Sequence, residues 1–211
     1  MVRDAVACGV ELEVLALREG VELDVPAHRV VTLAERAFAS LSQTVTPQGV
    51  LAIARRDEVP VAAALAAARA ARWPLVVLDG LQDPGNVGTL CRTAAAAGAP
   101  AVAVLDGCAD PFGPKAVRAS AGTVLRLAVA RAGWADLAGL RGWGAAATGG
   151  MPYDRAPLAD ADVVAFGAEA HGLRSNELEL VTIPMAPGVD SLNVAASAAI
   201  LLFEIRRRLA T

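Results

Sequence analysis

Short apolar runs alternate with helix-length stretches along residues 75–211. Each run is bounded by charged residues, glycine or proline, which is typical of strands buried on both faces of a parallel sheet. Strands that alternate with helices in this way predict an α/β fold, a mainly parallel sheet with helices on both faces. Ligands of such sheets bind at the carboxyl ends of the strands. The predicted strands are Leu75–Leu78, Ala101–Leu105, Trp143–Thr148 and Val163–Phe166.

Two helices in this region have clear limits. The first is predicted from about Thr89 to Ala97 and ends at Gly98, a residue that favours helix termination. The second is predicted over Val194–Leu209 and closes the chain. Its apolar residues occupy at least two faces, so we expect it to pack on the sheet and on something else, such as a second subunit.

Residues 1–56 predict a smaller α/β module. A unit of fewer than about 60 residues is marginally stable by itself. Residues 57–74 are rich in alanine, which favours helix, and end at Trp73-Pro74, so we interpret them as a helical linker. The predicted elements of the module are apolar runs at Glu13–Leu17, Arg29–Leu33 and Gly49–Ala54 and a helix at Ala34–Ser42.

Composition places the chain among folded proteins. Hydrophobic residues make up 55% and charged residues 19%, which excludes a disordered chain. Every strongly apolar run is broken before the roughly 18 residues that a membrane span needs. Residues 1–10 lack the cationic and apolar segments of a secretory signal. We therefore expect a cytoplasmic protein that does not associate with membranes.

The net charge and the cysteine content limit the possible functions further. The net charge of −3 argues against a uniformly basic nucleic-acid surface, but Lys115 is the only lysine among 19 basic residues. A codon bias toward G and C is the simpler reason for this arginine preference, although arginine also suits a local phosphate-binding patch. Cys8, Cys91 and Cys108 lie far apart and far from both histidines, so we expect no disulfide framework and no metal.

The polar segment after the first predicted strand, residues 79–88, leads directly into a helix. Its glycines match neither the dinucleotide-binding nor the phosphate-loop pattern, so those functions have little support. Backbone amides at such a helix start can hold an anion, and Asn86 and Arg92 could both face the end of the sheet. Alternatively, Asn86 is a turn or cap residue and Arg92 a solvated helix residue. The sequence leaves both interpretations open.

Two later loops carry further candidate residues. Glu169 follows the strand that ends at Phe166, and it has no second acidic partner for glycosidase chemistry, so it is either a site residue or a helix cap. His171 is more typical of a surface loop than of a general base. The loop from Ile183 to Val194 is rich in proline and glycine, and Ser191 or Asp190 could cap the helix that follows.

Taken together, the three loops resemble those of the SpoU (TrmH) family of the SPOUT superfamily. These proteins are RNA 2'-O-ribose methyltransferases that use S-adenosylmethionine. The motifs occur in the same order as in the family and span residues 75–211. They are LQDPGNVG (81–88) with Arg92, FGAEAHGL (166–173), and IPM (183–185) with SLNV (191–194).

The resemblance implies a SpoU-type methyltransferase domain at 75–211 with a C-terminal trefoil knot, an exception to the rarity of knots. It also implies a homodimer. Residues 1–56, which include SQTVTPQG (42–49), resemble the small substrate RNA-binding domain that often precedes this fold. Family members have a further helix and strand before the residues that match Val2–Val14, so this domain is expected to be shortened.

The resemblance also assigns roles to single residues. Arg92 is the catalytic arginine, placed near the ribose hydroxyl and a phosphate and supplied across the dimer. The reaction needs no metal because the sulfonium is already activated. Asn86, Glu169, Ser191 and Asn193 are expected to order the Arg92 loop and the nucleotide, Thr148, Gly167, Ile183, Met185 and Leu192 to bind S-adenosylmethionine, and Lys115 and Arg118 to contact RNA.

The resulting prediction is methylation of a ribose 2'-hydroxyl in ribosomal or transfer RNA, with ribosomal RNA favoured. One alternative is a noncatalytic RNA-binding protein that keeps the fold. A small-molecule enzyme with a Rossmann-like nucleotide site is less well supported, since the glycine pattern of that site is absent. Cofactor binding without methyl transfer would favour the first alternative, and turnover without RNA the second.

Overall fold

A computed structural model describes residues 1–42, 46–168, 171–175 and 177–210. Contacts within the chain divide it into two compact units, Met1–Asp57 and Glu58–Thr211. The boundary between the units falls at the start of the predicted linker, residues 57–74, nearly all of which belongs to the second unit.

The N-terminal unit contains a three-stranded sheet in the order β2-β1-β3. Strand β1 is parallel to β2 and antiparallel to β3. Leu15 of β1 and Phe38 of α2 are both buried and form part of the core of this unit. Its elements are α1 (Val2–Ala7), β1 (Leu12–Arg18), β2 (Arg29–Leu33), α2 (Glu35–Leu41) and β3 (Val50–Ala54).

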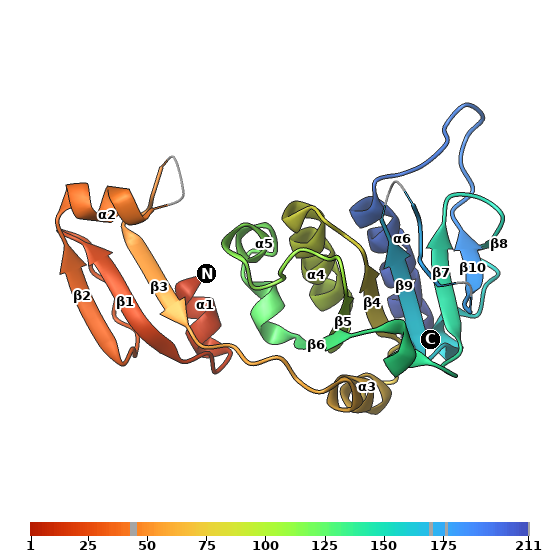
Figure 1. Cartoon of the computed structure of the whole chain (residues 1–211), viewed down its shortest axis with the longest axis horizontal. Coiled ribbons are helices and arrows are strands. Elements are labelled where there is room, and N and C mark those ends of the chain that lie inside the picture. The colour runs from red at the N-terminus through yellow and green to blue at the C-terminus, as the bar shows by residue number, and fades with distance from the viewer. Residues whose placement is uncertain (43–45, 169–170, 176, 211) are drawn as a thin grey trace. The chain divides into compact units, whose positions relative to one another are not determined.

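The C-terminal unit is built on a seven-stranded sheet in the order β6-β5-β4-β9-β7-β10-β8 (Figure 1). All pairings between these strands are parallel, which confirms the predicted α/β fold. The implied trefoil knot stays a prediction. The strands are β4 (Leu75–Asp79), β5 (Ala101–Leu105), β6 (Ala128–Ala132), β7 (Gly142–Ala146), β8 (Met151–Pro152), β9 (Val163–Gly167) and β10 (Glu179–Thr182).

Helices cover both faces of this sheet because successive strand residues point to opposite sides. On one face, Val76 and Leu78 of β4 share a core with residues of α4 (Pro84–Ala97) and α6 (Val194–Leu209). On the other face, Leu75 and Val77 share a core with α3 (Val61–Ala70). Thus α3, which lies in the predicted linker, packs on the sheet of the C-terminal unit. The remaining helical segments are α5 (Pro114–Ala119), η1 (Thr123–Arg126), η2 (Trp134–Leu137) and η3 (Leu158–Asp160).

Helix α6 has the bounds that the sequence predicted. Its inner face buries Ala198, Leu202 and Ile205, whereas Phe203 and Leu209 remain exposed. Exposed apolar side chains on a helix that already covers a sheet leave a surface for another contact. Across the described residues, no helix is both long and apolar enough to cross a membrane.

Helix α4 begins earlier than predicted, at Pro84 instead of near Thr89. The Asp83 side chain accepts a hydrogen bond from the Asn86 amide, and proline suits the first turn of a helix. Asn86 therefore belongs to the first turn of the helix and not to a preceding loop. Strands β6 and β10 were also missed by the sequence interpretation, because Arg131 and Glu179 interrupt their apolar patterns.

Helices α4 and α5 approach each other closely at Gly88. A Cβ atom at this position would lie 2.2 Å from the Ala116 carbonyl oxygen and 2.7 Å from the Ala119 Cβ. Both distances are shorter than van der Waals contact, so the packing of the two helices requires glycine here.

We expect Gly88→Ala to lower the free energy of unfolding by about 1–3 kcal/mol, because the methyl group overpacks the helix contact. This loss exceeds the gain of about 1 kcal/mol in helix propensity. Urea unfolding followed by circular dichroism measures the change. Thr89→Ala, exposed on the same helix, is the control and should change stability by less than about 0.5 kcal/mol. A Gly88→Ala protein as stable as the parent would contradict this account of the contact.

Candidate active site

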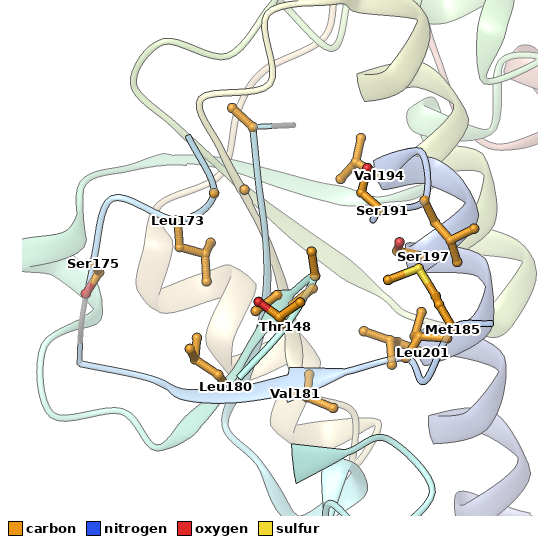
Figure 2. Close-up of a pocket in the computed structure, with 18 residues that line it drawn as sticks. Thr148, Leu173, Ser175, Leu180, Val181, Met185, Ser191, Val194, Ser197 and Leu201 are labelled. Carbon is orange, nitrogen blue, oxygen red and sulfur yellow. The ribbon is translucent and has the colours of Figure 1, made fainter. Parts of the chain in front are cut away.

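A cavity of about 400 Å³ lies beyond the carboxyl ends of β7, β9 and β10, next to the start of α6. In Figure 2, Leu173, Ser175 and Leu180 lie on one side of it, and Met185, Ser191 and Ser197 on the other. A volume of this size is typical of small-molecule and cofactor sites. We call this space the first cavity.

All five residues predicted to bind the cofactor line the first cavity. Four of them lie at or after strand ends and Leu192 precedes α6, so the fold brings together positions that are far apart in sequence. Their role in binding stays a prediction. Thr148 follows β7, Gly167 ends β9, Ile183 and Met185 follow β10, and Leu192 precedes α6.

The lining of the first cavity is largely apolar with a few hydroxyl groups. No ionised side chain occurs among the described residues that line it. This chemistry fits a flat aromatic base held between aliphatic side chains, with polar groups at the margin for orientation. The apolar side chains include Leu173, Leu180, Ile183, Met185 and Leu192, and the hydroxyls are those of Thr148, Ser175, Ser191 and Ser197.

Gly167 is required by the turn that closes one wall of this cavity. A Cβ atom here would lie 2.2 Å from the Gly172 carbonyl carbon and 2.5 Å from the Leu173 amide nitrogen. The family resemblance assigned this glycine to cofactor binding. The structure supplies an independent reason, because the chain folds back on itself through a bridge between Ala168 and Gly172.

A second cavity, of about 330 Å³, adjoins the first and shares Ala168 and Gly172 with it. The two cavities therefore have part of the same loop as a common wall. The second differs in charge, because its lining includes two acidic side chains and one guanidinium. Its polar lining residues are Asp79, Gln82, Asp83, Asn86, His171 and Arg174.

Asp79 and Arg174 form an ion pair that sequence reasoning missed. The Asp79 carboxylate is fully buried. It accepts hydrogen bonds from Arg174 Nε at 2.6 Å, from the Arg174 amide at 2.7 Å and from Trp134 Nε1 at 3.2 Å. The Arg174 guanidinium also donates to the Asp106 carbonyl oxygen. An acidic residue directly after a buried strand was the available sequence signal, but its partners lie 55 and 95 residues further along the chain.

Asn193 joins two of the three sequence motifs. As the N-cap of α6, its side chain accepts hydrogen bonds from the Ala195 and Ala196 amides. Its Nδ2 also donates to Oδ1 of Asn86 at 3.2 Å. The capping role that we considered for Asp190 or Ser191 therefore belongs to Asn193. Ser191 instead lines the first cavity.

The two residues predicted to contact RNA lie on α5. Lys115 Nζ is 2.9 Å from Oδ1 of Asp83, and this hydrogen bond is the main reason why the pKa of Asp83 lies below its usual value. Lys115 therefore pairs with the residue that caps α4. Arg118 is exposed on the same short helix.

Arg92 is exposed on α4 and lines neither cavity. It is six positions after Asn86 on the helix, a rotation that places the two side chains about 120° apart. Of the two, only Asn86 lines a cavity, and the role of Arg92 stays a prediction. Glu169, the remaining predicted site residue, lies outside the described residues. Of Ser175–Leu178, the helix that it was considered to cap, the described residues are not helical.

Thiol and metal chemistry are not prominent in this unit. Burial raises the pKa of the Cys91 thiol to about 12, and burial is also the main cause of the raised pKa of Cys108. Neither is a ready nucleophile near neutral pH, since the thiolate is the reactive form. Within the described part of the chain, no group of three or more His, Cys, Asp or Glu side chains could hold a metal ion.

A parallel sheet covered by helices, with a neutral cavity at its strand ends, defines an α/β domain of the cofactor-binding type. The chain belongs to the SpoU rRNA methylase family, whose family model matches residues 74–203. The matched residues include every strand of the sheet and all the described residues that line the two cavities. The match ends within α6.

Individual relatives agree with this family. The 23S rRNA (guanosine(2553)-2'-O)-methyltransferase RlmP of Bacillus subtilis (strain 168) is 34% identical over 184 residues, which are 82% of this chain and 71% of RlmP. An uncharacterized tRNA/rRNA methyltransferase of Synechocystis is 36% identical over 186 residues, 81% of this chain and 65% of that protein. The AdoMet-bound rRNA methyltransferase from Sinorhizobium meliloti has a TM-score of 0.81 and 29% identity, covering 100% of this chain and 85% of that chain.

We expect Asn193→Ala to destabilise the protein by about 1 kcal/mol, the usual result of removing an N-cap side chain. The loss of the contact with Asn86 adds to this effect. Ser191→Ala is the matched control and should leave stability within about 0.5 kcal/mol of the parent, because Ser191 does not cap α6. Thermal unfolding of both variants tests the assignment of Asn193 as the N-cap. Equal unfolding midpoints for the two variants would contradict it.

Proposed function

We propose that this chain is an S-adenosylmethionine-dependent RNA methyltransferase that modifies a ribose 2'-hydroxyl. The observation that carries the proposal is the first cavity, which the five predicted cofactor-binding residues line in a chain of the SpoU family. Ribosomal RNA is the favoured substrate and transfer RNA the alternative. RlmP, by its name, methylates the 2'-oxygen of a guanosine in 23S rRNA, which supports the ribosomal choice.

The residues of the first cavity fit S-adenosylmethionine. Ile183, Met185 and Leu192 provide an apolar slot for the adenine ring, and the hydroxyls of Thr148 and Ser191 provide hydrogen-bonding groups. The structural neighbour from Sinorhizobium meliloti was solved with AdoMet bound. When bound, the cofactor supplies a methyl group already activated by a positive sulfur.

Arg92 is proposed to act on the ribose hydroxyl electrostatically. An arginine is almost never neutral in proteins, so it lowers the pKa of the hydroxyl by its charge and is a poor base. Its planar guanidinium can contact a phosphate and the hydroxyl together. Because Arg92 lines neither cavity of its own chain, its participation requires a second copy of the protein.

A homodimer is therefore part of the proposal. The exposed Phe203 and Leu209 of α6 support it, since a large apolar side chain exposed on a packed helix is typical of an interface. In the dimer, Asn86 and Asn193 keep the first turn of α4 and the start of α6 in a fixed relation. Glu169 is proposed to order the same region.

RNA recognition is assigned to the N-terminal unit and to Lys115 and Arg118. The N-terminal unit corresponds to the predicted domain at residues 1–56, joined through 57–74. Side chains such as Lys115 and Arg118 position RNA through phosphates and do not read its sequence. We further propose that the protein acts in the cytoplasm, where its substrate is accessible.

The noncatalytic alternative predicts RNA binding without methyl transfer. The presence of every predicted cofactor residue in one cavity favours the catalytic function. A protein that only recognised RNA would not need an apolar slot beside the motif loops.

Methyl transfer should fall by about 100-fold or more in Arg92→Ala, with little change in affinity for S-adenosylmethionine. Loss of a charge that acts on the transition state reduces turnover and not ground-state binding. The substrate is the RNA whose 2'-O-methylation disappears from total RNA in cells that lack the gene. Methylation of that RNA with purified protein gives the rate, and calorimetry gives the affinity.

Arg126→Ala, an exposed arginine of η1, is the matched control and should retain full activity. Arg92→Lys should restore little of the lost methyl transfer, because lysine keeps the charge but lacks the planar guanidinium with its paired donors. Full activity of Arg92→Ala would remove this residue from the mechanism. If cells that lack the gene keep every 2'-O-methyl site, the proposed function itself is contradicted.

A mixture of two inactive proteins should regain activity if the site is shared between subunits. Leu192→Arg places a charge in the first cavity and should abolish cofactor binding, while Arg92→Ala removes the catalytic charge. A mixed dimer keeps one intact site, so random exchange of subunits should restore about a quarter of the wild-type activity, since half of the dimers are mixed and each has one of two sites. Purified mixed dimers that remain inactive would count against the shared site.

A further inference from the structure

The segment from Gly172 to Ser175 forms the wall between the two cavities. Gly172 lines both, Leu173 and Ser175 line the first, and Arg174 lines the second. Alternate side chains therefore serve opposite sides of the wall, as in an extended chain. Any rotation that moved Arg174 would also move the two side chains that line the first cavity.

Arg174 holds this wall against the end of the sheet. Its amide and its Nε each donate to a different oxygen of Asp79, at 2.7 Å and 2.6 Å, and its guanidinium also reaches the Asp106 carbonyl oxygen. Asp79 ends the central strand β4, and Asp106 directly follows β5. One side chain thus connects the wall to two adjacent strands.

Leu173 depends on this connection for its place in the first cavity. Its Cδ1 occupies the space beside Gly144, where a Cβ on that glycine would lie only 2.2 Å away. The contact leaves little freedom for the leucine, because a small displacement of the wall would break the packing on β7. Figure 2 shows Leu173 on the side of the cavity opposite Met185.

We propose that Asp79 and Arg174 are positioning residues for cofactor binding, which hold the Leu173 and Ser175 wall of the first cavity through the ion pair between Arg174 and the buried Asp79 carboxylate. This inference rests on the proposed function. A buried carboxylate is costly unless it receives well-directed hydrogen bonds, and Asp79 receives them from Trp134 and from both the main chain and the side chain of Arg174. The directions of these bonds fix the orientation of the wall.

The test is the double variant Asp79→Asn with Arg174→Gln. Removal of both charges avoids the unpaired buried carboxylate that substitution of Arg174 alone would leave behind. The shorter glutamine cannot reach both position 79 and the Asp106 carbonyl. Two measurements are made on the full chain, the S-adenosylmethionine Kd by calorimetry and the amide hydrogen exchange of Leu173 to Ser175 in the free protein.

We expect both the Kd and the exchange rates to rise at least about fivefold, the lower end of typical coupling between sites. Arg131→Ala is the matched control. Arg131 is 43% exposed against 47% for Arg174, and it also pairs with two partners, Glu58 and Asp110, but it lines neither cavity. Its loss should change both measurements by less than about twofold.

A rise below fivefold in either measurement would overturn the inference. If the parent protein does not bind S-adenosylmethionine, the proposed function fails, and the exchange rates alone then decide the positioning role. If circular dichroism shows that the double variant is unfolded, Arg174→Lys replaces it with the same thresholds, because a lysine that pairs with Asp79 cannot also hold Asp106.

Discussion

The buried carboxylate of Asp79 is the constraint on which the functional end of this sheet depends. A charge removed from water must be satisfied by nearby donors, and here they come from η2 and from the loop after β9. Strand β4 itself is buried on both faces and lies between β5 and β9. The carboxylate at its end therefore connects the centre of the sheet to the loop that separates the two cavities.

Whether the sequence predicted a strand depends on where that strand lies in the sheet. Strands β4, β5 and β9 are buried along their whole length because both of their faces are covered, and the sequence predicted all three. Strand β6 is an edge strand and β10 lies beside the edge strand β8, and both contain exposed polar residues, Arg131 and Glu179, so their apolar pattern is incomplete. Helix α3 was visible as a helix, but its packing on the sheet rests on Ala64 and Ala68, residues too small to mark a buried face by pattern.

The candidate site shows a similar division. The second and third family motifs located most of the predicted cofactor residues of the first cavity, and the first motif contributes Asn86 to the second cavity. The parallel sheet brings the strand ends that carry these motifs to the same edge. Other features depend on contacts that no local pattern contains. The Asp79 and Arg174 pair joins distant segments, and Asn193 both caps α6 and contacts Asn86, 107 residues earlier in the chain. Arg92 and Asn86 lie on one helix, but only Asn86 lines a cavity, since six helical positions place their side chains about 120° apart.

The close contact at Gly88 has a consequence for how this protein can evolve. Helices α4 and α5 meet there almost backbone to backbone, and the Lys115 and Asp83 pair joins them at a second point. The atom nearest to position 88 is a backbone carbonyl oxygen, so a change of side chain at position 116 cannot make room for a larger residue. Position 88 can accept one only if the backbone of α5 moves away from α4, and that movement would also disturb the pair between Lys115 and the residue that caps α4. The identity of residue 88 is thereby tied to the geometry of the site, although α5 lines neither cavity.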